Sequence, residues 1–337
     1  METSNPVLVE VTRGDAVESR HRGAAAVVDD DGALVAQWGD VGRGVYPRSA
    51  IKPIQALALV ESGAADRFSV SEEELALACA SHSGEPCHTE AVGAWLDRIG
   101  LGPEALQCAT QIPRDDASAH AMVRTGTQPT ALHHNCSGKH AGLLTTALHL
   151  DAPVADYLEP GHPVQRRVTR VLAEMSGVDL TDAVPAVDGC GIPTFAMPLG
   201  AVALALNRLA SPKGLEAKRA AAARRLFAAM TAHPYLVAGR ARFDTIAIEA
   251  GAGAFAVKTG AEGVHVAAVP AMGLGIALKI DDGAKRAAEV AMAALLHHLG
   301  VLDDAAQAAL APYLDAPVLN DAGLHVGAIR AAAGWPG

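Results

Sequence analysis

The stretch that decides the predicted fold is Tyr46–Pro53. It reads YPRSAIKP and continues as an apolar segment to Val60. Proline is tolerated only in the first turn of a helix, because it has no amide hydrogen for the bonds that later turns require. The position of Pro53 therefore predicts a helix that begins near Ser49. At this point we expect the chain to pass from strands to helices.

Strand patterns lie on both sides of a helix-rich middle. Before it, the valines at positions 7, 9 and 11 alternate, and an acidic turn separates Ala25–Val28 from Leu34–Trp38, as in a β-meander. After it, short strand patterns cover 255–258, 264–269 and 275–280, and helices return after Gly283.

The middle of the sequence is typical of helices. Ser71 and Glu74 form a capping box for a short helix through Cys79, and Ser81–Gly84 is expected to be the loop that ends it. Helical spacing of apolar residues recurs at 90–99, 138–150, 163–175 and 213–231. We therefore predict one α/β domain over residues 1–337, a mixed sheet covered by helices, with a helical middle lobe at about 60–235.

Composition restricts the class of protein. Half of the 337 residues are apolar and the formal net charge is -10, so we expect a sizeable core and no basic surface for nucleic acid. Residues 1–15 lack a signal-peptide pattern, and no apolar run reaches the roughly 18 residues of a membrane helix. Five widely spaced cysteines do not suit a secreted disulfide framework. A cytoplasmic protein without a membrane partner is expected.

Ser49 and Lys52 form an S-x-x-K motif. Residues i and i+3 on the first turn of a helix share a face, which places the lysine beside the serine hydroxyl. This arrangement suits a serine nucleophile whose proton is taken by the lysine. A surface helix start with a solvated lysine gives the same pattern, so the motif alone leaves both interpretations open.

A second motif, Lys258-Thr259-Gly260, ends a predicted strand. Penicillin-recognising enzymes combine S-x-x-K, a middle S-x-N loop and K-T-G in this order along the chain. Here the middle element is Ser81-His82-Ser83, which departs from the pattern in its last residue and lies only 32 positions after Ser49. These departures argue against β-lactam chemistry itself.

Longer motifs extend over most of the chain. They are RSAIKP (48–53), CASHSGE (79–85), HNCSGKH (134–140), DGCGIP (188–193) and KTGAEG (258–263). Together they strongly resemble the Rhizobium etli-type L-asparaginases, the third asparaginase class. The resemblance implies a serine β-lactamase-like fold, a homodimer, and two Ser-Lys tandems, Ser49 with Lys52 and Ser81 with Lys258.

The resemblance also implies a zinc ion held by Cys136, Lys139 and Cys190 beside the substrate pocket. Spacing alone does not predict this metal, because two cysteines far apart in sequence are core residues by default. A lysine ligand is unusual, since its amine must lose a proton to offer a lone pair.

The reaction that the resemblance implies is hydrolysis of L-asparagine to L-aspartate and ammonia. Lys52 would take the proton of Ser49, but a lysine is a base only when neutral, and lowering its pKa from about 10.4 to near 7 costs roughly 4 to 5 kcal/mol. Burial and a second cation supply such a shift, and Lys258 is the candidate for that cation. The tandems can also be reversed, with Ser81 as the primary nucleophile.

Four side chains near these motifs are candidates for substrate binding. Arg48 is a candidate for the substrate carboxylate. Asp188 and Glu85 either hold the amino group, orient a lysine or cap loops. Among the histidines near these motifs, His140 is the candidate for substrate binding.

Three other functions stay open at this point. A glutaminase, or another small-amide hydrolase, shares the motifs, because one methylene changes discrimination by only about 1 to 3 kcal/mol in an apolar pocket. A β-lactam-reactive acyl-serine protein accounts for the two short motifs alone. A zinc-containing amino-acid binding protein without catalysis accounts for the metal residues, although every expected catalytic position is occupied here.

Overall fold

The computed structural model describes residues 4–337, so the first three residues of the 1–15 segment lie outside it. The chain folds as two compact units. Unit 1 comprises the chain up to Ala50 together with Ala196–Ser211 and Ile246–Gly337, and unit 2 comprises Ile51–Phe195 and Pro212–Thr245. No helix within residues 4–337 is long and apolar enough to cross a membrane.

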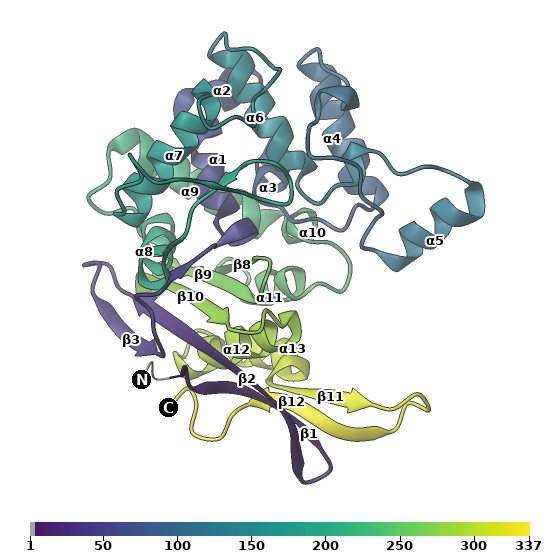
Figure 1. Ribbon diagram of the computed structural model, residues 1–337, viewed down its shortest axis with the longest axis vertical. Coiled ribbons are helices and arrows are strands. Elements are labelled where there is room, and N and C mark those ends of the chain that lie inside the picture. The colour runs from purple at the N-terminus through teal and green to yellow at the C-terminus, as the bar shows by residue number, and fades with distance from the viewer. Residues whose placement is uncertain (1–3) are drawn as a thin grey trace. The chain divides into compact units, whose positions relative to one another are not determined.

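The N- and C-terminal parts of the chain form one sheet in unit 1 (Figure 1). Its strands are β1 (Val7–Arg13), β2 (Ala16–Val28), β3 (Leu34–Trp38), β8 (Ala256–Thr259), β9 (Val264–Val269), β10 (Leu274–Ile280), β11 (Asp315–Leu319) and β12 (His325–Ala331). The order is β11-β12-β1-β2-β10-β9-β8, and β3 also pairs with β2. The pairs within this sheet are antiparallel, and successive strands such as β9 and β10 are joined by short turns.

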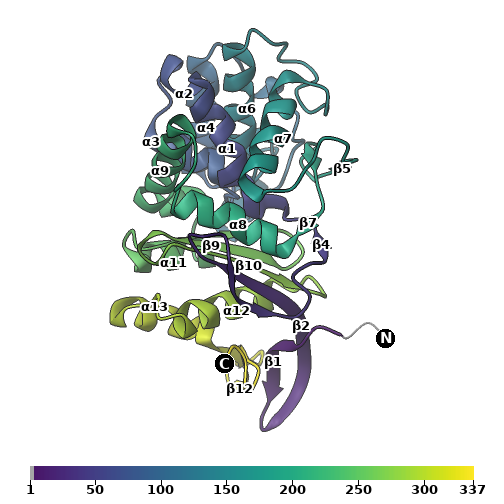
Figure 2. The same cartoon turned by 90° about the vertical axis from the view of Figure 1, so that its left-hand side faces the viewer.

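Helices cover both faces of the sheet in unit 1 (Figure 2). Helix α8 (Leu199–Ala210) packs on β2, β9 and β10, whereas α12 (Lys285–His298) and α13 (Asp304–Leu314) lie on the other side. Gly275 on β10 permits this close packing, because a Cβ there would overlap the backbone of α8 at Ala203 and Asn207. A side chain at this position would push the helix away from the sheet.

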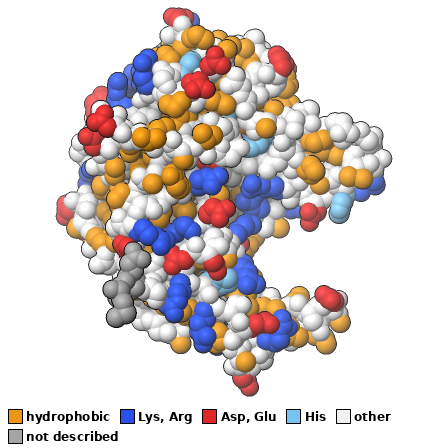
Figure 3. Space-filling model, in the orientation of Figure 1, with side chains coloured by type: hydrophobic (Ala, Val, Ile, Leu, Met, Phe, Trp, Pro, Cys, Tyr) orange, Lys and Arg blue, Asp and Glu red, His pale blue; other side chains and the backbone are white. Residues whose placement is uncertain are grey.

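Unit 2 is built from helices. They are α1 (Lys52–Ser62), α2 (Ala64–Arg67), α3 (Glu72–Cys79), α4 (Pro86–Arg98), α5 (Asp116–Thr125), α6 (Ser137–His149), α7 (Pro163–Ser176), α9 (Ala217–Ala232) and α10 (Pro234–Val237), and α11 (Phe243–Gly251) continues into unit 1. Helix α1 contacts α3, α6, α7 and α9, and its residues 52–60 are all buried. Helix α5 buries none of its residues, and apolar side chains are visible on the surface of this segment (Figure 3).

Two short strand pairs lie outside the main sheet. In unit 1, β4 (Gly44–Val45) pairs with β7 (Met197–Pro198). In unit 2, β5 (Ala186–Val187) pairs with β6 (Pro193–Thr194), and the turn between these strands carries Cys190.

The predicted α/β class, with a sheet covered by helices and a helical middle, is confirmed. The capping box of Ser71 and Glu74 is present at the start of α3. The first helix differs in one respect: residues Arg48–Ile51 form a 3-10 turn, η1, and the α-helix begins only at Lys52, with Pro53 still in its first turn. A 3-10 turn at a helix N-terminus has three residues per turn, so positions 49 and 52 remain on one side.

Candidate active site

Lys52 lies at the start of α1 and is 1% exposed. Its Nζ donates hydrogen bonds to Ala80 O at 2.5 Å, to Ser81 Oγ at 3.0 Å and to Asn135 O at 3.4 Å. Unit 2 therefore brings Lys52 and Ser81 together, although the family resemblance implies that they belong to different tandems. The hydroxyl of Ser81 is thus within reach of a proton carried by Lys52.

The surroundings of Lys52 lower the pKa of its amine. Burial lowers the pKa of the Lys52 amine below its usual value, and the Lys139 cation lowers it further, while the Cys136 thiolate opposes this shift. The net direction is downward, which is the direction that a lysine base requires.

The loop that follows α3 is fixed by its neighbours within unit 2. Ser81 N donates to Val237 O at 2.9 Å, and His82 N donates to Asn135 O at 3.2 Å. Gly84 N donates to His82 Nδ1, so the hydrogen on Nε2 is directed to Ser137 Oγ at 2.9 Å. Burial lowers the pKa of His82 well below its usual value, so this ring is neutral and holds the loop in place.

Cys136, Lys139 and Cys190 converge in unit 2. Cys136 and Lys139 are three residues apart at the start of α6, and Lys139 Nζ donates to Cys190 Sγ at 2.8 Å. A hydrogen bond with the Cys190 thiol lowers the pKa of Cys136 well below its usual value, and the same bond together with burial raises the pKa of Cys190. The pair therefore shares one negative charge, which lies beside the lysine.

The donor set at this position fits zinc. Thiolates are preferred zinc ligands, and two sulfur atoms and one amine approach one another here. In the described residues 4–337 no three His, Cys, Asp or Glu side chains form a metal site, because the third donor of this cluster is lysine. Burial lowers the pKa of Lys139, but its interactions with Cys190 and Cys136 more than offset this and raise it, so zinc binding would require loss of that proton.

Ser49 lies in unit 1, in the 3-10 turn η1, and the K-T-G strand packs against its segment. A Cβ on Gly260 would lie 2.8 Å from Pro47 O and 3.1 Å from the Cβ of Ala50, so only glycine allows this contact. Lys258 on β8 is 1% exposed, and its Nζ donates to Thr259 O at 2.6 Å. Unit 1 thus brings the end of β8, which carries Lys258, to the segment that carries Ser49.

Backbone strain accompanies the nucleophile candidate. Arg48, immediately before Ser49, has a φ of 52°, a left-handed conformation that is rare outside glycine. Such strain costs about 1 to 3 kcal/mol and persists where the surrounding structure imposes it, commonly at functional sites.

The two substrate-binding candidates with carboxylates, Asp188 and Glu85, differ in exposure and in their partners. Asp188 is partly exposed beside the cysteine cluster and acts to raise the pKa of Lys139. Glu85 is buried, and both of its oxygens are engaged within unit 2, by the Tyr235 hydroxyl at 2.5 Å and by Arg240 N at 2.9 Å. Glu85 therefore holds the 235–240 loop.

The candidate His140 is fully buried on α6. The Tyr157 hydroxyl accepts from Gln107 N at 3.0 Å and forms a second hydrogen bond with His140 Nδ1 at 2.7 Å. The Nε2 atom of His140 has no hydrogen-bond partner in the described chain. Burial, followed by the Lys139 cation, lowers the pKa of His140 well below its usual value, so the ring is neutral.

The sequence does not predict a role for two residues of this region. Asn135 accepts hydrogen bonds from both Lys52 and the His82 backbone through its carbonyl oxygen, and Tyr157 fixes the His140 ring. The motif HNCSGKH contains Asn135, but its contact is made by the backbone carbonyl, which every residue type has. Tyr157 lies in no motif and has no signal in the sequence.

Sequence comparison decides the family. The family model described as L-asparaginase II matches residues 9–331. The chain belongs to the L-asparaginase II family. Membership of this family supports an amidohydrolase activity. Among curated proteins, none matches the sequence.

Solved structures similar to this L-asparaginase II family member have low identity to it. Mglu in its native form is 14% identical with a TM-score of 0.49, over 84% of this chain and 66% of that chain, so the chain spans about two thirds of Mglu. A β-lactamase from Mycobacterium bovis is 15% identical with a TM-score of 0.39, over 86% and 94% of the two chains. A β-lactamase from Burkholderia ambifaria is 18% identical with a TM-score of 0.40, over 83% and 94%.

Proposed function

We propose that the chain hydrolyses L-asparagine to L-aspartate and ammonia through an acyl-enzyme on Ser49. The observation that carries this proposal is the buried Lys52 amine, which follows Ser49 by one turn, bonds with Ser81 Oγ at 3.0 Å and has a lowered pKa. A neutral amine at this position is a base for the nucleophile, and its hydroxyl neighbour is a path for the proton.

The reaction proceeds in two stages. Lys52 takes the proton of Ser49 Oγ as this oxygen attacks the carboxamide carbon, and backbone N–H groups at the helix start stabilise the oxyanion. The C–N bond then breaks, and the leaving nitrogen receives the proton from Lys52 through Ser81, so ammonia departs. Water next attacks the aspartyl ester, gives its proton to Lys52, and Ser49 regains a proton as aspartate leaves. Lys258 assists by disfavouring a second positive charge on Lys52.

Zinc is part of the proposal. Cys136, Lys139 and Cys190 would hold it, and zinc supplies positive charge that orients or polarises a bound carboxylate. The neighbouring Asp188 would keep the net charge of this region low.

Loss of either sulfur ligand is expected to remove the metal. Wild-type protein should contain about one zinc ion per chain, and Cys136→Ser or Cys190→Ser should contain about a tenth of that or less, because structural zinc depends on its full ligand set. Elemental analysis of the purified proteins measures this. Cys87→Ser is the matched control, since this cysteine is exposed. Undiminished zinc in both ligand variants would rule out the assignment.

Ammonia release by the purified protein tests the function itself. We expect release from L-asparagine, and a lower kcat/KM for L-glutamine, whose side chain is one methylene longer, by about 10- to 200-fold. A higher kcat/KM for L-glutamine would make the chain a glutaminase. Ammonia from neither amide, with aspartate still bound, would identify a binding protein, and a stable adduct with a fluorescent penicillin would identify a β-lactam-reactive protein.

A further inference from the structure

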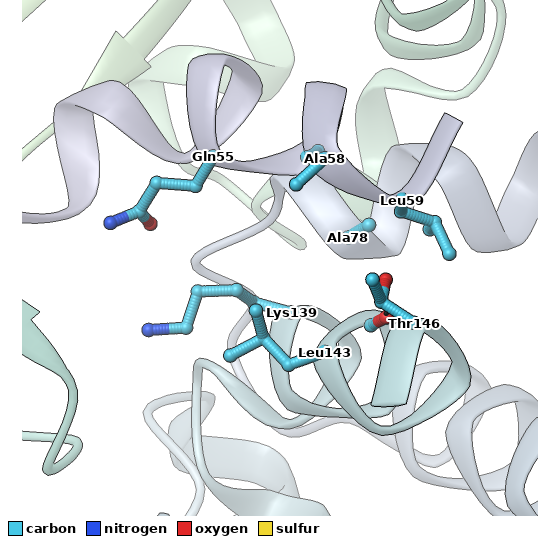
Figure 4. Close-up of a pocket in the computed structure, with 9 residues that line it drawn as sticks. Gln55, Ala58, Leu59, Ala78, Lys139, Leu143 and Thr146 are labelled. Carbon is cyan, nitrogen blue, oxygen red and sulfur yellow. Dashed lines mark hydrogen bonds between the residues drawn. The ribbon is translucent and has the colours of Figure 1, made fainter. Parts of the chain in front are cut away.

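Helices α1 and α6 are neighbours in unit 2, and both begin at the candidate active site. Helix α1 begins at Lys52, and Asn135 lies two residues before the start of α6. Further along, a small cavity lies between the two helices, with Leu59 of α1 and Leu143 of α6 in its walls (Figure 4). Because packing is interrupted there, the placement of Lys52 against Asn135 depends on the polar contacts at the helix starts.

The main-chain carbonyl of Asn135 receives hydrogen bonds from two parts of the candidate site. Lys52 Nζ donates to it at 3.4 Å, and His82 N donates to it at 3.2 Å. His82 follows Ser81, whose Oγ accepts from the same lysine at 3.0 Å. The Asn135 carbonyl therefore joins the candidate base to the loop that carries the neighbouring hydroxyl.

Asn135 is itself held by Gln111, which lies in the irregular segment before α5. The Oε1 atom of Gln111 accepts from Asn135 N and from Asn135 Nδ2, both at 2.9 Å. A main-chain N–H can only donate, so the Gln111 atom that faces it is the carboxamide oxygen and not the nitrogen. One side-chain oxygen thus fixes both the main chain and the side chain of Asn135.

The segment that carries Gln111 is also bound to the serine loop. This segment is Gln111–Asp115, which we call the strap. Arg114 N donates to Ser83 O at 2.8 Å. Gly84 permits close packing here, because a Cβ at this residue would lie only 3.2 Å from Pro113 Cα. The strap therefore contacts the serine loop through its main chain and Asn135 through a single side chain.

We propose that Gln111 is a positioning residue, which holds Asn135 so that Lys52 and Ser81 stay aligned for proton transfer. In the described part of the chain Gln111 bonds with neither of these two residues, so it acts through Asn135. Alignment of reacting groups is steep in its effect, since a displacement of about 1 Å can cost about 10²-fold in rate. The inference rests on the proposed function only in taking Lys52 and Ser81 to move the proton.

Two substitutions of similar size separate the oxygen of Gln111 from its bulk. Gln111→Glu keeps an oxygen that accepts from Asn135, whereas Gln111→Met fills the same space without an acceptor. Above the acid limb of the rate profile, where Lys52 is neutral, kcat for L-asparagine should fall about 10- to 100-fold in Gln111→Met, with KM little changed. In Gln111→Glu it should stay within about threefold of the wild-type value, because the bonds to Asn135 are kept.

Gln107→Met is the matched control for these variants. Gln107 lies four residues earlier on the same stretch, is exposed, and bonds through its main-chain N rather than its side chain. Its replacement should leave kcat unchanged. Unchanged kcat in Gln111→Met, or an equal loss in both Gln111 variants, would overturn the proposal. If the methionine variant does not fold, Gln111→Ser serves with the same expectations.

Amide hydrogen exchange gives a second readout that needs no reaction. Because His82 N donates to Asn135 O, loosening of Asn135 should expose this amide to exchange. In the whole protein, the peptide that contains Ser81–Gly84 should exchange about tenfold faster in Gln111→Met than in wild type, as measured by mass spectrometry. Gln111→Glu and Gln107→Met should match wild type. Wild-type exchange in Gln111→Met would contradict the role of Gln111.

These outcomes are distinguishable from a failure of the proposed function. Wild-type protein that releases no ammonia would refute the asparaginase proposal, and faster exchange in Gln111→Met would then still support the hold of Gln111 on the serine loop. Ammonia release by wild type together with an unchanged kcat in Gln111→Met would leave the reaction standing and refute the positioning role, whatever the exchange rate.

Discussion

Replacing Ser49 with alanine is expected to lower kcat for L-asparagine by about 10⁴-fold or more, the loss seen when a catalytic nucleophile is removed. Alanine removes only the attacking oxygen, and the 3-10 turn that carries it already contains Ala50, so the local backbone should persist. Aspartate should therefore bind as it does to the wild-type protein. Steady-state ammonia release and calorimetry with aspartate measure the two effects.

Ser81→Ala is the matched control for this substitution. It removes the hydroxyl that accepts from Lys52 at 3.0 Å, so it should slow proton transfer by about 10²- to 10⁴-fold, through kcat, and leave the nucleophile in place. Ammonia release in a single turnover should survive in Ser81→Ala, slowed to the same degree, and be absent in Ser49→Ala. If ammonia release survives in Ser49→Ala and not in Ser81→Ala, then Ser81 is the nucleophile and Ser49 serves proton transfer.

Replacing Lys258 with methionine is expected to move the acid limb of the rate profile to higher pH, by about one unit, and to slow the reaction about 10²-fold. The neutral form of Lys52 is the active one, so the rate falls as pH drops through its pKa. Burial already lowers that pKa. A second cation also disfavours protonation, so its removal lets Lys52 bind a proton at a higher pH.

The pH profile of kcat/KM measures this shift in the free enzyme. Lys279→Met is a suitable control, because Lys279 is a lysine of unit 1 whose amine bonds with backbone oxygens at Glu262 and Ile280. Its replacement should leave the acid limb where it is. If Lys258→Met also leaves the acid limb unchanged, then Lys258 does not lower the pKa of Lys52. Ser49 can still be the nucleophile in that case.

Much of the fold follows from local sequence signals. The short strand pattern at Val264–Val269 predicts β9 with its observed ends, and Ser71 with Glu74 predicts the start of α3. The hairpin of β11 and β12 is different, because its strands are short of β-branched residues and Pro317 interrupts the first of them. Its pairing with β1 is a contact between the two ends of the chain, which local patterns do not encode.

The candidate site is only partly readable in the sequence. The spacing of Ser49 and Lys52 predicts their position on one turn, because helical geometry is local. The bond between Lys52 and Ser81 joins residues 29 apart and depends on how α1 and α3 pack. The approach of Cys136 and Cys190 likewise depends on packing between distant segments, the start of α6 and the turn between β5 and β6. Only the resemblance to known asparaginases singles these cysteines out. Gln111 looks like an ordinary polar residue of a loop, and its bonds with Asn135 are visible only in the folded chain.

Trapping the covalent intermediate tests the role of Ser49 most directly. Wild-type protein is mixed with L-asparagine, quenched with acid within the first turnover, digested and mapped by mass spectrometry. We predict an aspartyl ester on the peptide that contains Ser49 and its absence in Ser49→Ala. An aspartyl group on the peptide that contains Ser81, in place of Ser49, would contradict the proposed mechanism.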